Sequence, residues 1–224
     1  MEVPTGSYLA DLKDIHKGSS VIYIIDCFDR GYTKQAFDTN YDITTLAVGS
    51  GTIDVTTEVS YVTMVTGANA ADTEGLRIND PIGLRSREYF VEVQVSLVAV
   101  AAIEFRMGFM AAANEYCYIE YDKSVNNNWR LTVNDTGGAQ FATPTGGAPG
   151  AGTEYYLSLW VDIDGTPHWM VGTPARDREE LLITDLTKKM TASAHYVQFW
   201  TKAEAGGAQT AKVCYLETMK TKAK

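Results

Sequence analysis

Two carboxylates and an amide lie close together near the middle of the chain, at Glu120, Asp122 and Asn126. In a strand, residues two apart point to the same side, so the two acids would share one face, the solvent face of a strand whose other face is apolar. Their oxygens suit Ca²⁺, but this ion takes six to eight oxygen ligands, and three residues supply only some of them. A carboxylate pair could also hydrolyse glycosides if the groups lay about 5–9.5 Å apart and one carried a proton. These residues are therefore only weak candidates for a metal site, and we predict neither a metal nor a cofactor.

Four aromatic residues are spaced so that pairs of them share an outward strand face. Tyr156 and Trp160 alternate with apolar residues on one segment, as do Tyr196 and Trp200 on another. Exposed rings of this kind bind sugars by stacking, so the four are carbohydrate-binding candidates. Alternatively the faces are covered by the N-terminal segment or a neighbouring subunit, since Tyr and Trp are enriched at protein interfaces. Coverage is the interpretation we favour.

Other catalytic patterns are missing from the sequence. The histidines at 16, 168 and 195 are scattered, and there is no Gly-x-Ser-x-Gly or His-x-x-x-His motif. No phosphate-binding glycine pattern follows an expected strand. The three cysteines, at 27, 117 and 214, form no Cys-x-x-Cys pair and are typical of reduced, inert thiols. We predict that the protein is not an enzyme.

Charge and hydropathy exclude two classes of partner. Acidic residues outnumber basic ones 28 to 19, giving a formal net charge of −9. An acidic surface repels nucleic acid and anionic membranes, so we expect neither as a partner. The longest apolar stretches, such as Val95–Ile103, are far shorter than the ~20 residues of a membrane span, and the N-terminus resembles no secretory signal. We expect a soluble protein made in a cytoplasm.

The sequence changes period after residue 20. Residues 1–20 are predicted to be an arm with a short helix, on which Leu9, Leu12 and Ile15 form one apolar stripe. The stripe would pack on the domain edge or dock on a neighbouring subunit, so these three residues are interaction candidates. Residues 220–224 are expected to form a basic tail.

Between these ends, residues 21–219 alternate apolar and polar positions. About a dozen short strands with almost no helix predict one all-β domain, an antiparallel two-sheet β-sandwich. The clearest strand is Tyr89–Leu97, and the segment Asn134–Thr153, with six glycines and two prolines, is expected to be a long hairpin tip with one short strand around Phe141. Further strands are expected at Val21–Phe28, Ile43–Val48, Thr52–Glu58 and Val59–Thr66, and around Ile103, Cys117, Leu131, Leu157, Val171, Val197 and Val213.

The stretch from residue 105 to 165 has a recognisable order of aromatic and turn residues. It runs through Phe105–Phe109 (FRMGF), Tyr116–Asp122 (YCYIEYD), Asn126–Trp129 (NNNW), Glu154–Asp162 (EYYLSLWVD) and Asp164-Gly165. This order resembles the concanavalin A-like (lectin/glucanase) jelly roll in the form found in bacteriophage structural proteins. The final strand, Lys212–Glu217, is similar to the one that closes such domains beside the N-terminal strand.

The resemblance also carries two site patterns, and the chain departs from both. Glucanases of this fold place a second Glu two or three residues after Glu-x-Asp, where this chain has Ser124 and Val125. Legume lectins bind metals with Glu-x-Asp-x-x-x-Asn followed by Asp and His; Glu120, Asp122 and Asn126 match, but Leu131 and Thr136 occupy the later positions. The resemblance therefore implies neither a hydrolase nor a metal-dependent lectin.

The leading functional hypothesis from the sequence is a structural protein of a tailed-phage virion. As a capsid decoration, cement or head-fibre protein, it would form a small homo-oligomer, bind the major capsid protein and reside in the virion after assembly in the host cytoplasm. The alternative is a carbohydrate-binding module of a tail fibre or spike that uses the four outward aromatic residues. A third hypothesis is a degenerate glycoside hydrolase.

Overall fold

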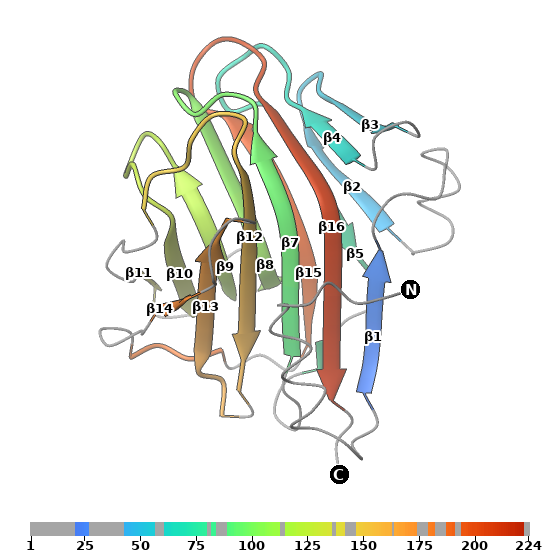
Figure 1. The fold of residues 1–224 in the computed structure, drawn as a ribbon, viewed down its shortest axis with the longest axis vertical. Coiled ribbons are helices and arrows are strands. Elements are labelled where there is room, and N and C mark those ends of the chain that lie inside the picture. Colours follow the sequence, from blue (N-terminus) through green and yellow to red (C-terminus); the bar gives the residue numbers. More distant parts are fainter. Residues whose placement is uncertain are drawn as a thin grey trace.

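The computed structural model describes residues 21–26, 43–56, 61–79, 82–83, 89–112, 115–135, 138–141, 147–162, 164–173, 179–181, 187–190 and 194–221. Two antiparallel sheets stack face to face in this part of the chain (Figure 1). None of its segments is a helix of the length and apolar character needed to cross a membrane. The expected N-terminal arm with Leu9, Leu12 and Ile15 lies outside the described residues, as do residues 222–224 of the expected tail.

The first sheet, sheet A, faces the viewer in Figure 1 and has the strand order β14-β13-β12-β7-β16-β4-β3. β1 pairs with the second half of β16, next to a bulge in β16 between Val213 and Tyr215. The predicted closure of the domain by the first and last strands is thus confirmed. The strands of sheet A are β1 (Val21–Asp26), β3 (Thr52–Thr56), β4 (Tyr61–Val65), β7 (Tyr89–Leu97), β12 (Glu154–Val161), β13 (Pro167–Gly172), β14 (Glu179–Leu181) and β16 (Thr210–Thr221).

The second sheet, sheet B, lies behind it and has the order β11-β10-β9-β8-β15-β5-β2, with β6 paired to one end of β15. Its four central strands β10, β9, β8 and β15 carry most of the polar residues that matter below. The strands of sheet B are β2 (Ile43–Val48), β5 (Thr73–Ile78), β6 (Ile82–Gly83), β8 (Ile103–Ala112), β9 (Glu115–Asp122), β10 (Arg130–Asp135), β11 (Gly138–Phe141) and β15 (Ala194–Ala203).

The core between the sheets comes from the apolar half of each alternating strand. Every second residue of β7 from Tyr89 to Leu97 is fully buried, as predicted, and β8 contributes Phe105, Met107 and Phe109 in the same way. Trp129, which follows the asparagine corner, is fully buried with its ring 6.3 Å from that of Phe105. Burial of such large apolar groups is the main favourable term in folding.

The described parts of the glycine-rich segment are anchored to this same chain. Gly147 accepts a backbone hydrogen bond from Trp129, and Gly150 donates one to the Tyr155 hydroxyl. In β11, which includes the expected strand at Phe141, the Gln140 side chain accepts bonds from the backbone of residues 187 and 188. These contacts pack the described parts of the segment against the rest of the chain.

The polar faces of both sheets are less solvated than simple alternation suggests. Glu92 on sheet A and Glu120 on sheet B both point away from the core, yet both side chains are fully buried. Ser158 donates a 2.5 Å hydrogen bond to Glu92. The expectation that Glu120 and Asp122 lie on a solvent face is therefore wrong. Both residues face away from the core, but neighbouring polar side chains enclose their carboxylates.

Candidate functional site

The four outward aromatic residues do not form one groove. Tyr156 and Trp160 lie on β12 and face outward from sheet A, whereas Tyr196 and Trp200 lie on β15 and face outward from sheet B. The two pairs therefore lie on opposite sides of the sandwich, and a single saccharide cannot contact both.

Trp160 on sheet A is covered. Its side chain is only 7% exposed, and its indole stacks on the His168 ring at 5.1 Å with an interplanar angle of 7°. Its neighbour on β7, Phe90, is fully buried. Trp160 is therefore buried, and coverage of this face by the N-terminal segment or a neighbouring subunit stays a prediction.

Tyr196 and Trp200 on sheet B are half-buried, and an arginine lies against each ring. The Arg106 guanidinium carbon lies 5.0 Å from the Trp200 ring centroid, and that of Arg77 lies 5.0 Å from the Tyr196 centroid. Such cation–π contacts contribute about 0.5–2 kcal/mol each. They also restrict the two rings, which we call the β15 aromatic pair.

The register of sheet B builds the surroundings of this pair in rows across the strands. One row runs through Gly75, Trp200, Arg106, Glu120 and Arg130. At its end the β5 backbone approaches Trp200 so closely that a Cβ on Gly75 would lie 2.3 Å from the Trp200 Cβ. Arg106 and Gly75 thus hold the indole from two sides.

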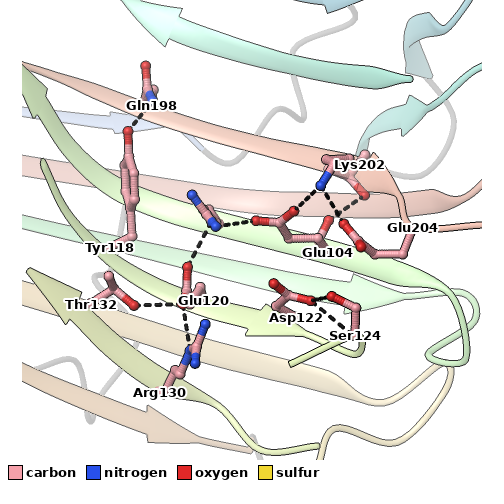
Figure 2. A network of polar contacts seen from close by, with 12 residues as sticks. Glu104, Tyr118, Glu120, Asp122, Ser124, Arg130, Thr132, Gln198, Lys202 and Glu204 are labelled. Carbon is pink, nitrogen blue, oxygen red and sulfur yellow. Dashed lines mark hydrogen bonds and ion pairs between the residues drawn. The ribbon is translucent and has the colours of Figure 1, made fainter. Parts of the chain in front are cut away.

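The next row runs through Arg77, Gln198, Gly108, Tyr118 and Thr132. Gly108 places no side chain on this face, and the Gln198 amide bridges to the Tyr118 hydroxyl at 2.5 Å (Figure 2). Both side chains are almost fully buried. This bond links β15 to β9 across β8 and fixes the side chains next to the aromatic pair.

Glu120 is held by two arginines instead of a metal (Figure 2). Its Oε1 accepts a 2.5 Å hydrogen bond from Arg130 Nε and a 2.6 Å bond from the Thr132 hydroxyl. Its Oε2 lies 2.7 Å from Arg106 Nε, where the approach is too bent for a hydrogen bond and is an ion pair. Two guanidinium charges at this distance repel a divalent cation.

The side-chain oxygens of the other two metal candidates accept hydrogen bonds from nearby residues. Asp122 Oδ1 accepts hydrogen bonds from the backbone nitrogen and the hydroxyl of Ser124, at 2.9 and 2.7 Å. Asn126 Oδ1 accepts the backbone N–H of Asn128 at 2.7 Å. Glu120, Asp122 and Asn126 therefore stabilise a network and two turns, and the described residues contain no cluster of His, Cys, Asp or Glu suited to a metal.

Chelation tests this assignment. We expect EDTA to leave the thermal midpoint unchanged, because the Glu120 carboxylate is neutralised by Arg106 and Arg130. A bound ion at a hundredfold excess over its Kd would contribute about 2.7 kcal/mol, which a melting curve detects as a shift of several degrees. A fall in the midpoint on chelation, restored by adding Ca²⁺, would contradict the assignment.

A second carboxylate on the outer face of sheet B, that of Glu104, has a raised pKa. Burial raises the pKa of Glu104 to about 7, although Arg106 and Lys202 act in the opposite direction. Lys202 Nζ lies 2.9 Å from Glu104 and 2.6 Å from Glu204, so one ammonium serves both acids. These three side chains border the Trp200 row at the loop end of β8 and β15.

The buried thiol and one buried imidazole are unsuited to nucleophilic catalysis. Burial raises the pKa of the Cys117 thiol, so the reactive thiolate does not form at neutral pH. His195 is fully buried, and burial lowers its pKa to about 4. Cys27 and His16 lie outside the described residues, and the side chain of Cys214 is not described either.

Sequence comparison finds no matching protein-family model and no matching curated protein. Among solved structures, a protein of unknown function from Shewanella oneidensis MR-1 matches with a TM-score of 0.63 at 15% identity, over 99% of this chain and 97% of that one. Peanut lectin matches with 0.59 at 10% identity, over 91% and 98%. A Bauhinia forficata lectin, solved in complex with GalNAc, matches with 0.56 at 12% identity, over 90% and 99%.

The chain has the concanavalin A-like jelly-roll fold. At these identities the likeness concerns the fold alone, and the site must be judged from this chain's own residues. The residues of this jelly roll that the sequence left unassigned are Arg77, Arg106, Gln198 and Gly108. Their roles depend on cross-strand neighbours. The alternation of β8 and β15 hinted that Arg106, Gly108 and Gln198 face outward, whereas β5, which carries Arg77, was not predicted.

Proposed function

We propose that this jelly roll is a non-enzymatic carbohydrate-binding domain that holds a saccharide on the outer face of sheet B, without a metal. The observation that carries the proposal is the β15 aromatic pair: two half-exposed rings on one strand face, each held by an arginine. They are four residue steps apart along the strand, or about 13 Å. That spacing suits an extended oligosaccharide better than a single sugar ring.

The chemistry of the surrounding face supports this proposal. Binding sites for small molecules combine aromatic surface with a few well-placed polar groups that fix orientation. Here Arg77, Arg106 and Gln198 lie beside the two rings, and hydrogen bonds and ion pairs hold them in place. A site whose groups are already ordered loses little conformational entropy on binding. The similar lectin structures agree with this kind of ligand.

A pair of tryptophan variants tests the proposal. On a glycan array, Trp200→Ala should weaken binding by roughly 30-fold or more, because truncating an aromatic hot spot costs about 2 kcal/mol or more. Its thermal midpoint should stay near that of the parent, since Trp200 is only half-buried. The matched control is Trp160→Ala, which should lose roughly 3–5 kcal/mol of stability because that indole is buried.

The two variants also distinguish a binding site on sheet B from one on sheet A. Glycan binding that survives Trp200→Ala at full strength would contradict the location of the site. Binding that is lost in Trp160→Ala while its stability is unchanged would move the site to sheet A.

The virion role expected from the resemblance has no support from the fold or the comparisons. Homo-oligomer formation, a capsid partner and location in a virion all stay predictions. The position of the gene beside capsid genes, tail genes or neither would test them directly.

A further inference from the structure

We infer that the saccharide recognised by the β15 aromatic pair is acidic, and that Arg77 binds its carboxylate. This inference rests on the proposed function and assigns the class of ligand. It begins from Arg77 on β5, which is directly opposite Gln198 and therefore at the level midway between Tyr196 and Trp200. A saccharide lying along the two rings would pass beside this guanidinium.

Arg77 differs from the other cations of this face in having no acidic partner among the described residues. Arg106 pairs with Glu104 and Glu120, Arg130 pairs with Glu120, and Lys202 pairs with Glu104 and Glu204. Arg77 instead stacks on Tyr196, and its Nε donates a 3.2 Å hydrogen bond to Asn79 Oδ1. A cation with no acidic partner in the described part of the chain attracts an anion to this point, although the protein has a net charge of −9.

The Arg77 guanidinium is held in a geometry that suits a carboxylate. Asn79, which accepts from its Nε, is itself held by the Thr44 hydroxyl at 2.8 Å. Among the described residues, the contacts of Arg77 are made by its Nε and by one face of the guanidinium, and they leave its two terminal nitrogens for a ligand. A guanidinium fork binds the two oxygens of a carboxylate through parallel N–H···O bonds, and its stem is already ordered here.

Neighbouring groups favour a sugar acid over a free anion. Gln198, the cross-strand neighbour of Arg77, has its amide nitrogen bonded to the Tyr118 hydroxyl and is fixed in orientation. The two rings of the β15 aromatic pair contribute to binding only when the anion belongs to a ring with an apolar face, such as a pyranose. The fixed cation and the two platforms together describe a uronic acid or another carboxylated sugar within a longer chain.

The experiment compares each acidic oligosaccharide with its carboxyl-reduced form, in which the sugar is the same but neutral. An array of uronic-acid oligomers and these reduced partners selects a ligand, and calorimetry then measures its affinity for the parent, Arg77→Gln and Lys212→Gln. Lys212 is the matched control, because its ammonium also lies over a tyrosine ring, 5.7 Å from that of Tyr61, but on sheet A. Both substitutions remove one positive charge.

We expect the parent to prefer the acidic form by about 10- to 100-fold, as for a charge-assisted bidentate contact. Arg77→Gln should abolish this preference while retaining affinity for the reduced form, and Lys212→Gln should change neither. The preference should also fall with added salt, since the Arg77 side chain is only half-buried.

The failures are distinguishable. Equal binding of acidic and reduced forms, or an unchanged preference in Arg77→Gln, overturns the inference and leaves the proposed function standing. A stronger preference for a sulfated than for a carboxylated oligosaccharide overturns the assignment of a carboxylate. If no oligosaccharide binds the parent, the proposed function fails and the inference fails with it. Acidic binding that needs Arg77 but survives Trp200→Ala supports the inference and contradicts the aromatic platform.

Discussion

Replacing Gly108 with alanine should leave the chain unable to form a stable sandwich. The backbone φ angle of Gly108 is 151°, in a region that side-chain-bearing residues rarely adopt. A Cβ at this position would lie 2.1 Å from the Cys117 carbonyl oxygen and 2.9 Å from Leu159 Cδ2. The oxygen belongs to the paired strand β9, so it cannot move without breaking the ladder between β8 and β9.

The size of this effect follows from two costs. An unfavourable backbone conformation costs about 1–3 kcal/mol, and overpacking a core adds typically 1–3 kcal/mol or more. Their sum, about 2–6 kcal/mol or more, is a large part of the stability of an ordinary domain, about 5–15 kcal/mol. Denaturant unfolding followed by circular dichroism measures it, and we expect a much lower midpoint or no cooperative transition.

Gly138→Ala is the matched control. Gly138 in β11 has a φ angle of 105°, but a Cβ there would meet nothing within 4 Å. It should lose only the conformational part, about 1–3 kcal/mol. If the two alanine variants were equally stable, the close approach of β9 to Gly108 would be wrong.

The second large effect is expected from Glu120→Ala. This carboxylate is fully buried and faces Arg106 and Arg130, so its removal leaves Arg130 with no acidic partner among the described residues and Arg106 with Glu104 alone. Breaking a buried ion pair in this way typically costs about 3–5 kcal/mol. We expect a loss of that order in the free energy of unfolding, and a weaker hold on Trp200, because Arg106 lies against its ring.

Asp122→Ala separates this explanation from a metal site. Asp122 binds only the nearby Ser124 among the described residues, so its loss should cost about 1 kcal/mol. Adding Arg130→Met to Glu120→Ala should recover part of the stability, since it removes the guanidinium that has lost its acidic partner. Equal losses in the two single variants, together with no recovery, would contradict the ion-pair network.

Local alternation accounts for much of what could be predicted of the fold. The bounds of β2 and β7 agree with the predicted Ile43–Val48 and Tyr89–Leu97. In these strands residues two apart share a face, and their apolar residues are numerous enough to mark it. β5 was missed because its sequence, TEGLRI, mixes charges and a glycine with only two apolar residues. Gly75 makes sense only beside Trp200, which is 125 positions later in the chain.

The candidate site was predicted in part for the same reason. The sequence by itself determined that Tyr196 and Trp200 share a face, because that follows from the period of one strand. Only the tertiary structure decided that Trp160 lies on the other sheet, that Arg106 and Arg130 pair with Glu120, and that the Arg77 guanidinium lies over the Tyr196 ring. Alternation records which side of a strand a residue takes. It does not indicate which strands become neighbours, because that depends on pairing between segments distant in sequence. The charges and contacts of this site arise from that pairing.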